Sequence, residues 1–221
     1  MSLGDVQTLG FRRGKLPHWT VADRSYFVTL CRKGCLPTRV IHELQAELEN
    51  LRLNEEAQQN LTRSGWQTRF QRVEEVLDRA ACGVCDLCEP TALQVIKDSL
   101  PWLQNRGWHV WAGTTMPSHL HLVLRNLAGR NDALAEDLGQ FKNYTGRKIN
   151  ALRGDSGAFW QRESFDRWCR DEQDWLGCIR YTLLNPVVAG LAVEWRGWPG
   201  TFVDEEIVGN LGDMTKPAIL G

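Results

Sequence analysis

The sequence predicts an α+β fold, in which β-strands are combined with amphipathic helices. Residues 26–31, YFVTLC, are of the β-branched and aromatic types that favour a strand. Residues 108–126 hold two apolar runs joined by Met-Pro-Ser, a pattern that predicts two strands and a turn. Several longer segments repeat apolar residues at helical spacing.

The chain is long enough to bury one sizeable core. It has 221 residues, of which 43% are hydrophobic, and a net charge of −1. Because the charge is close to balanced, any surface that binds nucleic acid must be a local basic one. We expect one domain over residues 1–204. Residues 205–221, acidic and then rich in Gly and Pro, are expected to form a tail outside the core.

Location and cysteine use point to the cytoplasm. No stretch approaches the ~20 apolar residues of a membrane span, and the first residues lack the apolar core of a signal peptide. Seven cysteines without an export signal fit a reducing compartment. Cys82, Cys85 and Cys88 form two CxxC steps, which could begin a zinc or iron–sulfur site. The other cysteines are scattered without a matching CxxC, so we favour the interpretation without a metal.

The N-terminal part contains a basic, aromatic segment. Residues 11–19, FRRGKLPHW, place Arg12, Arg13 and Lys15 between two aromatic residues. Such a basic arm suits contact with phosphates and bases, although a loose basic N-terminus explains it equally. Strand 26–31 follows. Helices are then expected over residues 38–54, 70–81, 90–103 and 131–152, with a polar, helix-prone connector at 55–71 that is a candidate insertion.

The helix at 131–152 has a basic face. Its polar side carries Lys142, Arg147 and Lys148, and Phe141 and Tyr144 interleave with these charges. A solvated helix face explains the charges alone, whereas contact with nucleic acid explains the charges and the aromatics together. The short segment 158–170 adds three further arginines, Arg162, Arg167 and Arg170, which suit either DNA contacts or salt bridges.

The second apolar run of 108–126 contains His119 and His121. Side chains two residues apart point to the same face of a strand, so the two imidazoles are expected side by side. Polar groups against a sheet need partners. Two half-exposed histidines on a solvated face are the ordinary interpretation of this spacing. The pair therefore needs further residues before it indicates a site.

A helix with clear signals follows at residue 171. Asp171 is expected to cap it, its first turn is acidic, and it should end near Pro186, because the residue before a proline avoids helical geometry. Tyr181 and Asn185 lie four residues apart and so share one face. Taken singly, Tyr181 is a boundary aromatic and Asn185 a C-terminal cap.

Together these motifs resemble a known family. LPHW, YFVTL, MPSHLHLVL, FWQRESFDRWCRDEQDW and IRYTLLNPVVAGL are similar to segments of IS200-like transposases of the tyrosine HUH class, and most similar to REP-associated tyrosine transposases. The resemblance runs in order from Arg12 to Phe202. Two differences stand out: Gly113 and two threonines are expected to loosen the strand before the histidines, and Ser118 replaces the family's common asparagine.

The resemblance implies a fold and a chemistry. The fold is a ferredoxin/RRM-like antiparallel sheet with helices on one face, the HUH endonuclease core. His119 and His121 correspond to the metal-binding pair, Tyr181 to the nucleophile and Asn185 to the residue that completes the metal site. Tyr144 is the rival nucleophile. Nitrogen ligands suit Mn²⁺ better than Mg²⁺, whereas Mg²⁺ is the more abundant ion. Either ion is therefore expected to work.

The function implied is DNA transposition. The enzyme would cleave and join single-stranded DNA at hairpin-forming repeats with a flanking guide sequence, through a covalent 5′-phosphotyrosine, as a monomer or homodimer. The basic arm is the candidate contact for the guide. The remaining alternative is a host-retained DNA-binding protein of the same fold without strand transfer. The cations implied in DNA contact are Arg12, Arg13, Lys15, Lys142, Arg147, Lys148, Arg162 and Arg167.

Overall fold

The computed structural model describes residues 8–13, 17–21, 23–36, 86–130, 133–209 and 211, with the isolated residues Arg39 and Leu77. Apart from Arg39 and Leu77, the expected helices at 38–54 and 70–81 lie outside the described residues. The candidate insertion, Lys15, Cys82 and Cys85 also lie outside them.

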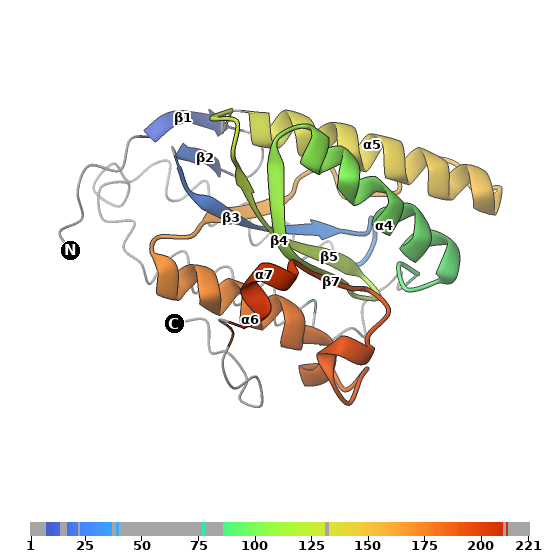
Figure 1. Cartoon of the computed structure of the whole chain (residues 1–221). Helices are drawn as coiled ribbons and strands as arrows, with labels where there is room; N and C mark the ends of the chain where they lie inside the picture. The colour runs from blue at the N-terminus through green and yellow to red at the C-terminus, as the bar shows by residue number, and fades with distance from the viewer. Residues whose placement is uncertain are drawn as a thin grey trace.

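A five-stranded antiparallel sheet forms the centre of the fold (Figure 1). Its strands lie in the order β6-β3-β5-β4-β7, so the strand with the two histidines is central. The predicted strand–turn–strand segment forms β4 and β5, and YFVTLC lies in β3. The α+β prediction is therefore confirmed. The strands are β3 (Ser25–Cys31), β4 (Trp108–Thr115), β5 (His119–Asn126), β6 (Phe165–Trp168) and β7 (Thr201–Val203).

Two long helices cover one face of the sheet (Figure 1). They are α4 (Pro90–Asn105) and α5 (Leu134–Arg153), and they pack on Leu120, Leu122 and Leu124 of β5. α4 has Pro90 at its first position, where the missing N–H has no helical partner in any case. α5 ends at Gly154, whose φ of 72° is the left-handed conformation that glycine adopts readily.

A third helix covers the other face. α6 (Glu172–Val188) packs on β4 and β5, where Val123 joins a second apolar cluster with Ile179 and Leu183. Because side chains alternate along a strand, the residues of β5 that do not face α4 and α5 must face α6. The helices therefore lie on both faces of the sheet, rather than on one face as the family resemblance implied. The position of α6 against the histidine face is the one that Tyr181 requires if it is the nucleophile.

Four local expectations are corrected. α6 continues two residues beyond Pro186, which lies in its last turn, where few helical hydrogen bonds remain to be lost. The strand before the histidines is not loosened, since residues 113–115 are paired with β5. Phe141 does not stand among exposed charges, because it is 1% exposed in the core under α5. The described residues of the basic arm, 11–13 and 17–19, are not loose, since β1 (Thr8–Arg13) pairs with β2 (Pro17–Val21).

The core also extends past residue 204. The short helix η2 (Trp195–Gly197) leads to β7 and then to α7 (Glu205–Val208). Ile207 and Leu211 are 3% and 1% exposed and belong to the apolar cluster under α6. The backbone oxygen of Leu211 accepts hydrogen bonds from Arg180 of α6. The expected boundary at residue 204 therefore leaves out residues that pack in the core.

Candidate functional site

His119 and His121 stand side by side on the face of the sheet that α6 covers. Their ring centroids are 4.4 Å apart, and the side chains are 1% and 0% exposed. The strand period of two places both rings on this face, as predicted, while the intervening Leu120 packs on the other face. The interpretation as half-exposed histidines on a solvated face is wrong. Buried imidazoles require partners.

A hydroxyl group contacts the Nδ1 atom of each histidine. Thr29 Oγ1 lies 3.0 Å from His121 Nδ1, and Ser118 Oγ lies 3.0 Å from His119 Nδ1. Thr29 comes from β3, whose register places it directly opposite His121. With Nδ1 of His119 in contact with a hydroxyl, Nε2 is the atom of that ring that remains for a ligand. Neither hydroxyl was predicted from the sequence, although Thr29 is the one polar residue in YFVTLC apart from the terminal cysteine.

His119 is held as a neutral imidazole. Burial, and then the neighbouring His121, keep the pKa of His119 well below its ordinary value. Among the described residues, the buried Nε2 of His119 has no hydrogen-bond partner. A neutral ring with a buried, unpartnered nitrogen is the form that binds a metal. This donor therefore fits a divalent cation.

α6 brings Tyr181 to the histidines. The centroid of the Tyr181 ring lies 5.5 Å from that of His121 and 5.9 Å from that of Phe27. Asn185 follows one turn later on the same helix and is 2% exposed. The sheet and the helix thus place Tyr181 against the histidine pair. The rival Tyr144 is 52% exposed and belongs to α5, which covers the opposite face.

The start of α6 is tied to the sheet. Asp171 caps the helix by accepting a hydrogen bond of 2.8 Å from the Asp174 backbone N–H. Asp174 also receives two hydrogen bonds from Arg167 of β6, at 2.9 and 2.8 Å. Another nitrogen of that guanidinium lies 2.9 Å from Cys178 Sγ. The sequence left two roles open for Arg167, a DNA contact or a salt bridge. These contacts favour the salt bridge.

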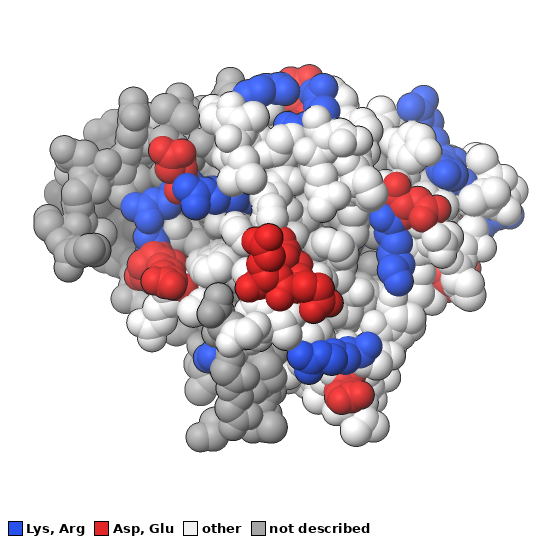
Figure 2. Space-filling model, in the orientation of Figure 1, with Lys and Arg blue, Asp and Glu red and all other residues white. Residues whose placement is uncertain are grey.

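The other predicted cations lie away from the histidines. Arg147 and Lys148 are exposed on α5, and the Arg162 side chain is 89% exposed. Lys142 is partly buried, and its ammonium donates to the backbone oxygens of Gln161 and Arg162. Arg12 and Arg13 lie in β1. Figure 2 shows one face with charges of both signs, including acidic side chains over α7, in keeping with the balanced net charge.

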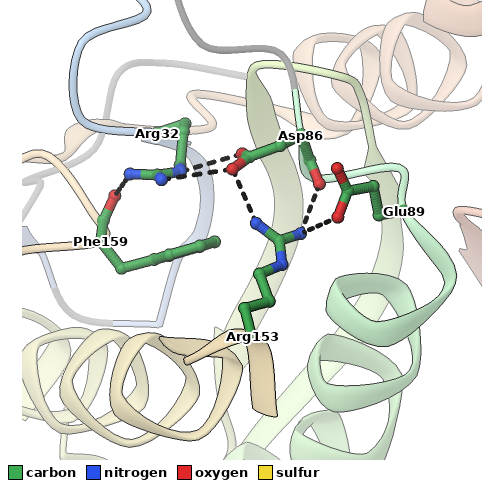
Figure 3. A network of polar contacts seen from close by, with 5 residues as sticks. All are labelled: Arg32, Asp86, Glu89, Arg153 and Phe159. Atoms are coloured by element: carbon green, nitrogen blue, oxygen red, sulfur yellow. Dashed lines mark hydrogen bonds and ion pairs between the residues drawn. The ribbon is translucent and has the colours of Figure 1, made fainter. Parts of the chain in front are cut away.

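A partly buried ionic network supports the end of the sheet where His119 lies (Figure 3). Asp86 accepts hydrogen bonds from Arg32 and Arg153, and Arg153 also pairs with Glu89. Arg32 is the residue after β3, and its backbone N–H bonds to the Ser118 oxygen. The network thus joins α4, α5 and β3 beside the turn before His119. It was not predicted from the sequence, because its members are far apart in the chain.

Two further findings bear on the site. Within the part of the chain that the structure describes, there is no group of three or more His, Cys, Asp and Glu residues that could hold a metal. A metal at the histidine pair would therefore need the amide oxygen of Asn185 or ligands from outside the protein. In the same described part, no helix is both long and apolar enough to cross a membrane.

Comparison with known proteins supports the fold. No protein-family model matches the chain, and no curated protein matches it. Among solved structures, a REP-associated tyrosine transposase bound to a REP hairpin matches with a TM-score of 0.52 and 12% sequence identity. The match covers 96% of this chain and 93% of that chain. The likeness concerns the fold, and at that level it confirms the resemblance of the motifs: this chain has the fold of a REP-associated tyrosine transposase.

Proposed function

We propose that this protein cleaves and rejoins single-stranded DNA, with Tyr181 as the nucleophile. The observation that carries the proposal is the Tyr181 ring, 5.5 Å from His121, on the helix that covers the histidine face. The structural neighbour is a tyrosine transposase bound to a REP hairpin, which supports DNA as the substrate. DNA transposition at hairpin-forming repeats is the corresponding biological role.

The residues that would hold a divalent metal are His119, His121 and Asn185. The two Nδ1 atoms contact hydroxyls, and the His119 Nε2 is buried without a partner among the described residues. Two imidazoles and an amide oxygen suit Mn²⁺, and Mg²⁺ would serve because ligands from outside the protein complete its shell. When bound, such an ion withdraws charge from the phosphate under attack.

Tyr181 would carry the covalent step. The phenol, whose ordinary pKa is about 10, must lose its proton, and water is the acceptor that the proposal requires. The Tyr181 oxygen then forms a bond to the phosphorus, and the bond from phosphorus to the 3′ oxygen breaks. The 3′ oxygen gains a proton and leaves as a hydroxyl, while the 5′ phosphate stays on Tyr181. Attack by a 3′-OH reverses these bonds and joins strands without ATP.

The substrate is proposed to be a DNA hairpin with an unpaired guide sequence. The candidate contact for the guide is the hairpin β1–β2, which carries Arg12 and Arg13 and lies beside β6. The assembly is proposed to be a monomer or a homodimer, which a native mass measurement decides.

The test uses a labelled hairpin oligonucleotide with Mn²⁺ or Mg²⁺. The wild-type protein should form a covalent adduct that survives denaturation, and the Tyr181→Phe variant should bind the hairpin without forming it. Tyr144→Phe is the matched control and should keep the adduct. His119→Ala should lose the adduct while it still binds the hairpin. If Tyr181→Phe forms as much adduct as the wild type, Tyr181 is not the nucleophile.

One observation favours a second candidate function. His119 and His121 are 1% and 0% exposed, so a DNA phosphate does not reach them in this arrangement of the chain. A protein that binds the hairpin and performs no strand transfer is consistent with such burial. Tight binding of the hairpin by the wild type, with no adduct under any metal condition, would select this candidate over the enzyme.

A further inference from the structure

A groove lies on the opposite side of the molecule from α6. It has a volume of about 460 Å³ and runs between α5 and the segment 157–164. Phe159 and Trp160 line it and are themselves 3% and 6% exposed, so the base of the groove is anchored in the core. None of the residues proposed to hold the metal or carry the covalent step lines this groove.

The groove carries a surplus of positive charge. Lys142, Arg147 and Arg162 line it, against a single carboxylate, that of Glu163. Arg147 approaches from α5 and Arg162 from the opposite segment, and both are exposed. The two arginines therefore face the groove from its two walls.

Lys142 has a different part. Its ammonium donates hydrogen bonds of 3.2 and 2.7 Å to the backbone oxygens of Gln161 and Arg162. These bonds tie the segment with Arg162 to α5 and so fix the width of the groove. Lys142 therefore positions a wall. The two arginines are held only weakly, since Arg147 Nε donates to the Asn143 backbone oxygen at 3.3 Å and the exposed Arg162 lies 4.0 Å from Glu163.

The groove lies at the same end of the sheet as His119. The Gln161 backbone N–H donates to the Cys31 backbone oxygen at 2.8 Å, and the backbones of Trp160 and Arg32 form an isolated antiparallel β-bridge. Cys31 is directly opposite His119 in the register of β3 and β5. A strand of DNA bound in the groove would therefore lie at the end of the sheet where His119 is.

We propose that this groove binds the phosphate backbone of an unpaired DNA strand that flanks the cleaved position. The inference rests on the proposed function and adds a second contact to it. Arginines on two walls suit a chain of phosphates. A hollow of about 460 Å³ is too small to hold a whole duplex, and Gly139 in the wall leaves room for close approach of a strand.

The sharpest test uses Gly139 of α5. A Cβ at this position would meet no atom within 4 Å, so a side chain there enters open space. Gly139→Glu would place a negative charge in the groove, while glutamate favours a helix more than glycine does. Gly139→Ala is the matched control, because alanine also favours a helix more than glycine does and adds no charge. Unfolding therefore cannot explain a difference between the two variants.

A second test removes the charges. In the variant Arg147→Gln/Arg162→Gln, affinity for a hairpin with an unpaired flank should fall about tenfold. The salt dependence of binding should flatten by about one unit for each phosphate that an arginine no longer neutralises. Arg130→Gln is the control, since Arg130 is exposed after β5, at the end of the sheet away from His119. It should bind as the wild type does.

Fluorescence anisotropy with EDTA measures binding without cleavage, on labelled hairpins with and without the unpaired flank. The inference predicts that Gly139→Glu and the double variant weaken binding of the flanked hairpin alone. It is overturned if both hairpins lose affinity equally, if neither does, or if Gly139→Ala or Arg130→Gln has the same effect. Adduct formation with Mn²⁺ tests the proposed function separately, so a wild type that forms no adduct refutes that function and not the groove.

Discussion

Thr29 and His121 face each other across β3 and β5, with the Thr29 hydroxyl 3.0 Å from Nδ1 of the imidazole. The contact sets the direction of the ring, because the imidazole can turn Nε2 elsewhere only by breaking it. On the other side of His121, Thr114 of β4 occupies the corresponding cross-strand position. Among the described residues its hydroxyl has no hydrogen-bond partner. Thr29 and Thr114 therefore allow a matched comparison between a hydroxyl that contacts His121 and one that does not.

Thr29→Val should weaken metal binding while the fold remains. Partners that orient a ligating histidine typically contribute about 10–100-fold in metal affinity, and we expect a loss in that range. Competition of Mn²⁺ with a fluorescent chelator measures it, and circular dichroism checks the fold. Thr114→Val should leave the affinity unchanged and be neutral or slightly stabilising. Equal losses in both variants would show that the Thr29 hydroxyl has no special role.

Asp86 should stabilise the protein at neutral pH and less in acid. Burial alone would raise the pKa of Asp86, but the hydrogen bonds from Arg32 and Arg153 outweigh it and hold the pKa below its ordinary value. A lowered carboxylate pKa gives stability that is present above about pH 4 and is lost as the pH falls through the folded-state pKa. Asp86→Asn should cost about 1–3 kcal/mol at neutral pH.

Urea denaturation at neutral pH and at about pH 3 measures this difference. Glu89→Gln is the control, because Glu89 pairs with the same Arg153 but its side chain is 59% exposed. It should cost less than about 1 kcal/mol. If the difference in free energy of unfolding between the wild type and Asp86→Asn stays constant down to acid pH, the ionised carboxylate of Asp86 does not provide this stability.

Regular patterns allowed much of this fold to be predicted. β3, β5 and α6 follow from residue type, alternation and the Asp171 cap, all of which act within a few residues. The pairing of His119 with His121 on one face follows from the strand period alone. These parts of the candidate site depend on local geometry, which a sequence expresses directly.

The remaining parts depend on contacts between distant segments. Thr29 meets His121 only because β3 and β5 pair in one register, and Asp86 meets Arg153 across 67 residues. Nothing in the sequence around Phe141 marks it as buried, because charged residues lie near it on both sides. In the structure its side chain nevertheless packs in the core on the inner side of α5. Ile207 lies in an acidic segment whose composition suggested a tail. Tertiary packing decides such positions, and local pattern does not express it.

Gly200 should tolerate no side chain. A Cβ at this position would lie 2.5 Å from the Thr115 backbone oxygen, which also accepts a hydrogen bond from Trp198 Nε1. Gly200→Ala must therefore separate β4 from the chain before β7, and we expect a loss of about 1–3 kcal/mol. Gly177→Ala in α6 is the control, because its Cβ meets no atom within 4 Å. It should stabilise by about 0.5–1 kcal/mol. Thermal denaturation of both variants decides the matter.

The ion pair between Arg167 and Asp174 should position α6, and its loss should affect the covalent step more than DNA binding. Burial would raise the pKa of Asp174, but the hydrogen bond and charge of Arg167 outweigh it, so the pKa is lowered. Asp174 is therefore ionised at neutral pH, and its contribution is lost as the pH falls through that lowered pKa. Arg167→Met and Asp174→Asn should each slow adduct formation at saturating hairpin DNA, because both release the start of the helix that carries Tyr181.

A double-mutant cycle separates this role from DNA contact. If the ion pair carries the effect, Arg167→Met/Asp174→Asn should be little worse than either single variant, in stability and in adduct rate. Hairpin affinity should stay within about threefold of the wild type, since in this role Arg167 binds no phosphate. If instead Arg167→Met weakens hairpin binding and flattens its salt dependence while Asp174→Asn does neither, then Arg167 contacts DNA, because only the arginine could supply such a contact.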